Sequence, residues 1–544
     1  MKKILLIGIN CRYTHTNLAL RYLRKISSSS PHKIVLREFT INQQFLHILS
    51  NIVTSDADII AFSVYIWNSN LIKMLLSELK KINPGVKFIL GGPEAGYNPE
   101  KWLAEFPFID YIITGSGERS WKYLQKNSFE LPEQVISLPV EDFSEIPFPY
   151  SEAEFAELEN RYIYYEASRG CSFKCSYCLS SRSDQKLLRN QLQRVKQELD
   201  YFCSKNIKIV KFVDRTFNAD PQYARAIWNY LREKETSIKF HFEIHPSLLQ
   251  PEDFELLSKI PEERFQFEIG IQSVNPATLT SINRFTEWNK IKANINKILE
   301  LQNIHVHVDL ITGLPYEDFA SMKNSFNEVH ALNAEHFQLG FLKLLPGTEL
   351  DEKKKEFGIK HTSEPPYEVL STKWMNFSQI DHFRKLSKLI DSFYNTEHFK
   401  TTLPELISLQ GSAYEFYDFL YRSYFINHPD EISRNWQLNG ACLTRLIKDN
   451  FSTQREFLLD CLRWDWCRYA SSHYYPDFLQ SSLLAEAKVK GRKILLSNYP
   501  DKFPKNEMNK AIYFQSGNDN FKQKYLSGLN FAVFSGKRLL LKFN

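Results

Sequence analysis

The sequence has no long uninterrupted apolar run and no strong excess of charge. No stretch approaches the roughly 20 apolar residues of a membrane-spanning helix, and the run ADIIAFSVYIW is bounded by Asp58 and Asn68. The amino-terminal apolar stretch meets Asn10 too early for a secretory signal. The 68 basic and 63 acidic side chains leave a net charge of +5, without a block of Lys or Arg. We therefore expect a soluble cytoplasmic protein with no membrane partner, and nothing indicates a nucleic-acid partner.

Cysteine is also scarce, because eight cysteines in 544 residues are too few for a disulfide framework. Three of them, Cys171, Cys175 and Cys178, nevertheless lie within eight consecutive positions. This clustering indicates metal chemistry in a reducing compartment.

The first 130 residues alternate strand-like and helix-like segments. Alternation of this kind predicts an α/β domain with a doubly wound, flavodoxin-like parallel sheet, whose ligand site lies at the carboxyl ends of the strands. The expected strands occupy residues 2–10, 33–42, 57–67, 86–94 and 109–118.

Residues 131–160 are rich in proline and acidic residues and are expected to form a linker. The alternation resumes over residues 161–350 with longer helices and predicts a (β/α)6 partial barrel. Residues 351–544 lose the β-branched runs and predict a helical carboxyl-terminal domain. The six barrel strands are expected over residues 162–168, 207–214, 238–245, 264–272, 305–313 and 335–345.

The clustered cysteines directly follow the first expected barrel strand, so they fall on a loop at its carboxyl end. Spacings of three and two residues let three thiolates converge on one 4Fe-4S cluster and leave one iron open. A structural zinc site normally closes with a fourth Cys or His, and none occurs in LSSRSDQKLL after Cys178. Inert buried thiols are the other alternative. The pattern favours the iron–sulfur interpretation.

The CxxxCxxC spacing, with Tyr177 before the last cysteine, resembles the signature of the radical S-adenosylmethionine (SAM) superfamily. The resemblance implies that the open iron binds the methionine group of SAM, beside Tyr177. One electron, from a donor such as flavodoxin or ferredoxin, would then cleave a carbon–sulfur bond. The resulting deoxyadenosyl radical would remove hydrogen from a substrate.

The resemblance also implies SAM contacts on later strands. Asp214 ends the second barrel strand, where members of the superfamily meet the methionine amino group; alternatively, Asp214 caps the following helix. Glu268 and Gln272 lie four apart on one face of the fourth strand and match the region that approaches the ribose and carboxylate of SAM. A hydrogen-bond network inside the barrel is their alternative role.

His305, His307 and Asp309 alternate with valines on the fifth strand and share one face. Two histidines and a carboxylate suit a metal, but one strand alone makes a weak site. Hydrogen-bonded core or substrate-pocket residues are the favoured interpretation.

A doubly wound domain placed before such a barrel resembles the cobalamin-binding arrangement of a large branch of the superfamily. The matching stretches follow four of the expected strands, and their glycines let the backbone approach a large ligand. The cobalamin contacts that this resemblance implies are Arg12, Thr14, His15, Ser63, Tyr65, Gly91, Gly92, Pro93, Glu94, Gly115, Gly117 and Glu118.

One departure from the cobalamin pattern concerns the cobalt ligand. Domains of the methionine synthase type carry Asp-x-His-x-x-Gly after the first strand, whereas this chain reads NCRYTH over residues 10–15. Either cobalt has no protein ligand here, or His15 is positioned differently, or cobalamin is not bound. A flavodoxin-like domain without a cofactor, or one that binds a flavin or a nucleotide, are the further alternatives.

The carboxyl-terminal region resembles an uncharacterised extension found behind such domain pairs, and we expect it to cover the substrate mouth. Cys442, Cys461 and Cys467 contain no CxxC pair and fall in expected helices, so a second cluster is disfavoured.

These observations together predict a cobalamin-dependent radical SAM enzyme that methylates an unactivated carbon of a small-molecule or peptide substrate. Rearrangement or thiomethylation are other possible outcomes of the reaction. The first alternative is a cobalamin-free, methylthiotransferase-like enzyme that modifies RNA or a peptide. The second alternative is a non-catalytic metal-binding protein.

Overall fold

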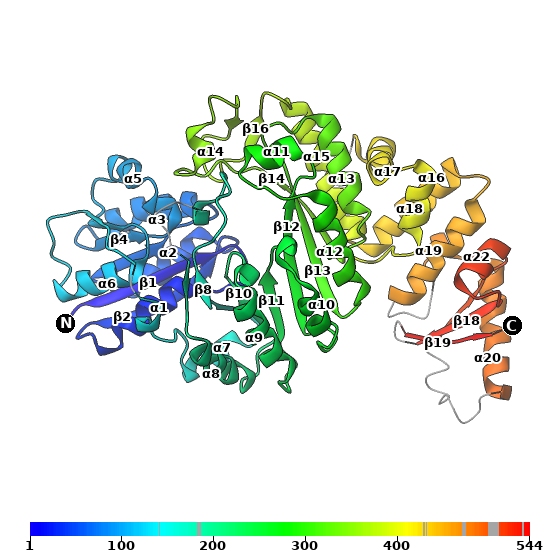
Figure 1. The fold of residues 1–544 in the computed structure, drawn as a ribbon, viewed down its shortest axis with the longest axis horizontal. Coiled ribbons are helices and arrows are strands. Elements are labelled where there is room, and N and C mark those ends of the chain that lie inside the picture. Colours follow the sequence, from blue (N-terminus) through cyan, green and yellow to red (C-terminus); the bar gives the residue numbers. More distant parts are fainter. Residues whose placement is uncertain are drawn as a thin grey trace. The chain divides into compact units, whose positions relative to one another are not determined.

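The computed structural model describes most of the chain and divides it into two compact units. The first unit comprises Met1–Phe319 and Phe341–Phe377, and the second comprises Ala320–Gly340 and Ser378–Asn544 (Figure 1). Within the described part of the chain, no helix has the length and apolar composition that a membrane crossing requires. The described residues are 1–140, 142–181, 187–427, 430, 432–469, 475–498, 511–535 and 538–543.

The first domain is built on a parallel sheet of six strands, as the alternating pattern predicts. Its strands are β1 (Lys3–Asn10), β2 (Lys33–Thr40), β3 (Ile59–Ser63), β4 (Lys87–Gly91), β5 (Tyr111–Ile113) and β6 (Val135–Ile136). Their order is β2-β1-β3-β4-β5-β6, and all pairs are parallel. The strand β6 lies in the expected linker and extends the sheet beyond residue 130.

Helices cover both faces of this sheet, because successive side chains of each strand point to opposite faces. Leu5 and Ile7 pack in one buried cluster with α2 (Phe45–Val53) and α3 (Ser69–Ile82). Ile4 and Leu6 pack in a second cluster with α1 (Leu18–Ile26) and α6 (Gly117–Lys126). The doubly wound fold is therefore confirmed, and the carboxyl ends of its strands share one edge (Figure 1).

The second sheet contains all six expected barrel strands. They are β7 (Ile163–Tyr165), β10 (Ile209–Phe212), β11 (Lys239–Glu243), β12 (Phe265–Gln272), β13 (Ile304–Thr312) and β14 (His336–Phe341). Their order is β14-β13-β12-β11-β10-β7, so β7 and β14 are the edges of an open partial barrel. Along β12 and β13, fully buried residues alternate with partly buried ones. The partly buried face is the polar interior of the barrel.

The carboxyl-terminal region is mainly helical, as expected, but it also contains a small sheet. Its helices include α15 (Phe377–Leu389), α16 (Thr402–Gln410), α17 (Ala413–Leu420), α18 (Trp436–Asn450), α19 (Arg455–Tyr469) and α20 (Ser482–Asn498). The antiparallel sheet comprises β17 (Ile512–Gln515), β18 (Phe531–Ser535) and β19 (Arg538–Phe543). Strands this short carry too little alternation to be distinguished from buried helix by sequence alone.

Cys442, on α18, and Cys461 and Cys467, on α19, lie in this helical region. Burial raises the pKa of the Cys442 and Cys467 thiols to about 12, and Cys467 Sγ lies 2.9 Å from Tyr475 Oη. These are environments of inert thiols rather than of cluster ligands.

Candidate active site

The three clustered cysteines lie on the loop that follows β7 and the short strand β8 (Ser168–Arg169). Gly170 has a φ of 94°, a conformation that favours glycine, so the chain turns directly before Cys171. Backbone hydrogen bonds run from Ser176 N to the Ile282 oxygen (3.1 Å) and from Leu350 N to the Ser176 oxygen (2.8 Å). Two neighbouring loops therefore hold the cysteine loop in place.

The three thiols are close neighbours, but they are spaced too widely for one metal ion. Burial raises the pKa of the Cys175 thiol, the Arg284 guanidinium opposes this, and the charges of Cys178 and Cys171 raise it further. Zinc–sulfur bonds of 2.3 Å place tetrahedral sulfurs about 3.8 Å apart. Among the described residues, no group of three metal-ligating atoms within 4.8 Å includes any of these thiols. As they lie, the three thiols do not form the compact group that one zinc ion requires.

A buried arginine that the sequence did not reveal lies beside the cysteine loop. Arg284 Nη1 donates to Tyr177 Oη (3.3 Å) and approaches Cys175 Sγ at 4.0 Å, and Nη2 donates to the Gly270 oxygen. Its Nε is buried and has no hydrogen-bond partner among the described residues. A cation with a free donor at this place can neutralise thiolates and bind a carboxylate. Arg284 belongs to no motif, and only the folded loop brings it here.

Asp214 anchors the start of the cysteine loop. Its carboxylate accepts hydrogen bonds from Ala167 N (3.0 Å) and Ser168 Oγ (2.6 Å), and only 2% of the residue is exposed. Burial raises the pKa of Asp214 to about 7. The following helix α9 (Pro221–Arg232) is capped by Asp220 instead, so the alternative capping role for Asp214 is wrong.

Glu268 and Gln272 both lie on the inner face of β12, as predicted, but their surroundings differ. Glu268 Oε2 lies 2.9 Å from His241 Nε2. Burial alone would raise the pKa of Glu268, but the hydrogen bond with His241 helps to lower it to about 2. The amide of Gln272 folds over Gly270, and its Oε1 is buried without a partner among the described residues. Glu268 thus joins an internal network, whereas Gln272 keeps a polar atom available for a ligand.

His307 and Asp309 form a second histidine–carboxylate pair on the neighbouring strand. His307 Nε2 lies 2.9 Å from Asp309 Oδ1. Ligand atoms of Glu268, His307 and Asp309 lie within 4.8 Å of one another. Since His241 hydrogen-bonds with Glu268 and His307 lies against Asp309, we interpret this group as a polar barrel lining, which was the favoured sequence interpretation.

A cavity of about 280 Å³ lies at the carboxyl edge of the first sheet. A Cβ at Gly92, where φ is 96°, would lie 2.6 Å from the Val64 oxygen, whereas a Cβ at Gly115 would enter open space. These glycines therefore make the backbone wall of the cavity. The predicted contacts that line it are Ser63, Tyr65, Gly91, Gly92, Pro93, Gly115, Gly117 and Glu118.

The other four predicted contacts do not line this cavity. Thr14 uses its backbone oxygen to accept from Tyr162 N, and Glu94 accepts from Tyr367 Oη. Arg12 is exposed. His15 instead lines a second cavity, described next.

The second cavity, of about 620 Å³, lies where the first sheet edge meets the barrel. It extends from His15 and Tyr164 to Arg215 and Glu243, whose charged atoms are 3.7 Å apart. It adjoins the smaller cavity, because both are lined by Ala19, Tyr65, Glu118 and Arg169. The second cavity is also lined by Gly170, directly before Cys171 on the cysteine loop. Arg169 and Arg215 are further lining residues that the sequence did not single out.

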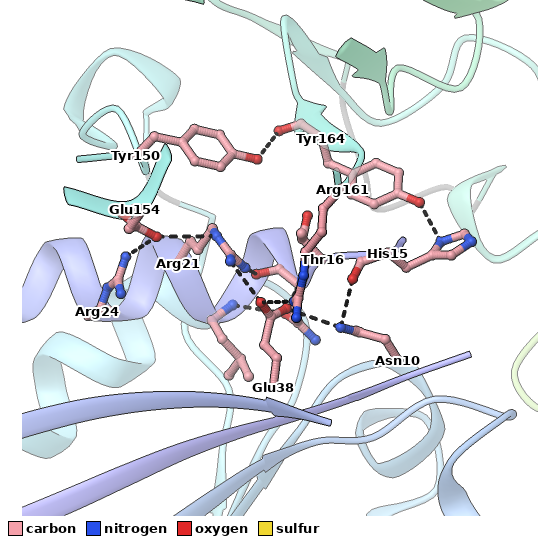
Figure 2. A network of polar contacts seen from close by, with 12 residues as sticks. Asn10, His15, Thr16, Arg21, Arg24, Glu38, Tyr150, Glu154, Arg161 and Tyr164 are labelled. Atoms are coloured by element: carbon pink, nitrogen blue, oxygen red, sulfur yellow. Dashed lines mark hydrogen bonds and ion pairs between the residues drawn. The ribbon is translucent and has the colours of Figure 1, made fainter. Parts of the chain in front are cut away.

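A buried ion network joins α1 and β2 of the first domain to the residues directly before β7, as Figure 2 shows. Glu38 on β2 pairs with Arg21 of α1 (2.7 Å) and with Arg161 next to β7 (3.3 Å). Glu154 pairs with Arg21 Nε (3.3 Å) and with Arg24. We call Arg21, Glu38, Glu154 and Arg161 the interdomain clamp.

His15 lies at the edge of the interdomain clamp. Its Nδ1 hydrogen-bonds with Tyr164 Oη at 2.6 Å, which fixes the imidazole against the barrel (Figure 2). Burial, followed by the charges of Lys211 and Arg12, lowers the pKa of His15. His15 therefore presents a neutral ring to the second cavity.

Family comparisons agree with this geometry. Residues 165–329 match the Radical SAM superfamily, and residues 4–122 match the B12 binding domain. This chain is a radical SAM protein with an amino-terminal cobalamin-binding domain. Residues 355–524 match a family described as a protein of unknown function, DUF4080. The radical SAM assignment contradicts the interpretation as a non-catalytic zinc protein.

Curated relatives of this radical SAM protein are distant in sequence. The 2-(S-pantetheinyl)-carbapenam-3-carboxylate methyltransferase of Streptantibioticus cattleyicolor is 23% identical over 56% of this chain and 49% of its own length. The cobalamin-dependent radical SAM methyltransferase TokK of Streptomyces tokunonensis is 21% identical over 57% and 51%. The chain thus spans about half the length of these two relatives.

Solved structures share the fold of this radical SAM protein. The cobalamin-dependent radical enzyme OxsB, with aqua-cobalamin and SAM bound, aligns with a TM-score of 0.59 and 15% identity over 97% of this chain and 84% of that one. The radical SAM methyltransferase TsrM of Kitasatospora setae aligns with a TM-score of 0.56 and 14% identity over 70% and 82%. The predicted pairing of a doubly wound domain with a partial barrel is confirmed.

The residues present fit the three cofactors of this family. Cys171, Cys175 and Cys178 would be the ligands that hold the 4Fe-4S cluster, and the unpartnered atoms of Arg284 and Gln272 suit the polar groups of SAM. The glycine-walled cavity suits part of cobalamin, since its backbone leaves room that side chains would fill.

Proposed function

We propose that this protein is a cobalamin-dependent radical SAM methyltransferase that methylates an unactivated carbon of a small-molecule or peptide substrate. The observation that carries the proposal is the pair of adjoining cavities, one with a glycine wall and the other lined by Gly170, directly before Cys171. Such a pair of cavities lets a cobalamin site, a SAM site and a substrate face one another, so that the reacting groups are held in register.

When bound, the cluster and SAM supply a radical that removes hydrogen from carbon, and cobalamin supplies the methyl group. The protein's own residues orient and enclose these groups. Arg284 stabilises negative charge at the thiolates, and Gln272 is placed to hydrogen-bond SAM. Asp214 acts as a positioning residue, because it holds the strand that leads into the cysteine loop.

The substrate is proposed to occupy the larger cavity. Arg215 and Glu243 offer opposite charges there, and Tyr164 and His15 offer a hydroxyl and a neutral imidazole. This lining supports a substrate with polar groups rather than a lipid chain. The bond between His15 Nδ1 and Tyr164 leaves Nε2 as the His15 nitrogen that could ligate cobalt.

We further propose an electron donor such as flavodoxin or ferredoxin, and a cytoplasmic location. The location is supported by the cysteine content, which is too low for a disulfide framework. The division into residues 1–130, 131–160, 161–350 and 351–544 also remains our proposal. It is supported by family matches that fall within the first, third and fourth segments.

The proposal is tested by anaerobic reconstitution of the full chain with iron, sulfide and cobalamin, followed by turnover with SAM labelled in its methyl group and candidate substrates. Labelled product that depends on cobalamin supports the proposal. Labelled product that forms without cobalamin, or that contains added sulfur, supports the methylthiotransferase-like alternative and overturns ours.

A further inference from the structure

Residues 362–369, at the start of the region that matches the family of unknown function, run along the end of the barrel. We call this segment the tether. Its backbone is hydrogen-bonded there, from Val369 N to the Leu342 oxygen and from Leu344 N to the Tyr367 oxygen, both at 2.9 Å. A Cβ on Gly313 would lie only 2.7 Å from Val369 Cγ1. The tether is therefore packed closely against the barrel.

On its other side, the tether reaches the first domain through one buried contact. Tyr367 Oη donates to Glu94 Oε1 at 2.6 Å, and the two residues are only 6% and 8% exposed. Glu364 of the tether also approaches Lys73 (3.6 Å) and Lys101 (4.0 Å), but it is 55% exposed. Exposed ion pairs contribute little, so the Tyr367–Glu94 bond is the main attachment.

Glu94 lies in α4 (Pro93–Gly96), directly after the glycines that wall the smaller cavity. Pro93 and Gly96 of this helix line the cavity, whereas the Glu94 side chain lies against Tyr367. The backbone at Gly92 is packed against the Val64 backbone, because a Cβ at this position would lie 2.6 Å from the Val64 oxygen. The chain next to Glu94 therefore has little space in which to move. A displacement of Glu94 would therefore be transmitted to the cavity wall.

We propose that Tyr367 is a positioning residue whose hydrogen bond to Glu94 holds α4 in the place that lets the first domain retain cobalamin. This inference rests on the proposed function and gives the first residues of the uncharacterised region a role. Glu94 then acts through the helix that carries it rather than by touching the cofactor.

The test compares the full-length protein with Tyr367→Phe, which removes only the donor. The control is Tyr165→Phe, because Tyr165 donates to Glu198 at the same 2.6 Å in a buried site within the barrel. Dissociation constants for hydroxocobalamin and for SAM are measured in parallel by absorbance and equilibrium dialysis. We expect Tyr367→Phe to weaken cobalamin binding about 5- to 20-fold, a typical coupling between sites, with SAM binding unchanged. Tyr165→Phe should leave the ratio of the two constants at its wild-type value.

A second pair of variants keeps the test independent of one substitution. Glu94→Ala should weaken cobalamin binding as much as Tyr367→Phe does, and the double variant should lose no more than either single one. Glu94→Gln, which keeps an acceptor oxygen, should restore most of the affinity.

Two results would overturn the inference while the proposed function stands. One is wild-type cobalamin affinity in Tyr367→Phe, and the other is an equal loss of cobalamin and SAM binding in Tyr367→Phe. A wild-type protein that binds SAM but no cobalamin would instead overturn the proposed function, and the inference with it.

Discussion

At the scale of single residues, charge beside the cysteine loop is the feature that most directly affects the chemistry. Arg284 is a buried cation whose Nη1 lies 4.0 Å from Cys175 Sγ, and its hydrogen bonds to Tyr177 and Gly270 fix its position. Burial disfavours its charged form, but the neighbouring Tyr177 and Cys175 raise its pKa. The cation therefore stays charged where thiolates bind iron.

Replacing Arg284 by Gln removes this charge and should lower the midpoint potential of the cluster. A unit charge 5–10 Å away at an effective dielectric constant of about 20 gives a shift of roughly 50–150 mV. A redox titration followed by electron paramagnetic resonance measures it. Arg284→Lys keeps the charge and should retain most of the potential. A potential that is unchanged in Arg284→Gln contradicts the electrostatic role.

Asp214 should make the free energy of unfolding depend on pH, whereas an asparagine at this position, which does not titrate, should not. Its pKa is raised to about 7 in the folded protein, from an unfolded value near 3.8. The stability associated with its protonated form is full below the unfolded pKa and is lost as pH rises through 7. Between pH 5.5 and 8, the free energy of unfolding of the wild-type protein should therefore fall by about 2 kcal/mol relative to that of Asp214→Asn. Urea unfolding at both pH values tests this, and parallel pH profiles would contradict it.

At the scale of elements, the interdomain clamp joins α1 and β2 of the first domain to the chain that enters the barrel. Glu38 is the centre of the clamp, since it pairs with both Arg21 and Arg161. Burial raises its pKa, but the Arg21 charge outweighs this and lowers it. Its contribution is therefore present above the unfolded pKa, near 4.5, and is lost as pH falls through the lower folded value.

Glu38→Gln should lower the free energy of unfolding by about 3–5 kcal/mol near pH 7, because Arg161 loses its carboxylate partner and Arg21 keeps only Glu154. The matched control is Glu130→Gln. Glu130 also pairs with two cations, Lys2 (3.0 Å) and Lys87 (2.8 Å), but its side chain is 63% exposed. Glu130→Gln should lower the free energy of unfolding by less than about 1 kcal/mol. Equal losses in urea unfolding would show that the clamp has no special role.

The elements were predictable from sequence where the signal is local. The buried runs of β1, the alternation along β13 and the spacing of Cys171, Cys175 and Cys178 each depend on neighbouring residues only. The orientation of Glu94 was not predictable, because it depends on Tyr367, which lies 273 positions away. Arg284 was missed for the same reason.

At the scale of the whole molecule, the first unit contains every residue of the candidate site. The glycine-walled cavity, the larger cavity and the cysteine loop all lie within it. The carboxyl ends of parallel strands are where such sheets bind ligands, and here the two cavities adjoin at those ends. That arrangement is what a reaction with several cofactors requires.

The most direct test of this account measures iron, zinc and 5′-deoxyadenosine in the full-length protein after anaerobic reconstitution with SAM and a reductant. The wild-type protein and the control Cys203→Ala, whose thiol lies on α8 (Leu192–Cys203) away from the loop, should each contain four irons and form deoxyadenosine. Cys175→Ala should lose the cluster and form none. Deoxyadenosine formed equally by Cys175→Ala, or zinc in place of iron in the wild-type protein, would contradict the account.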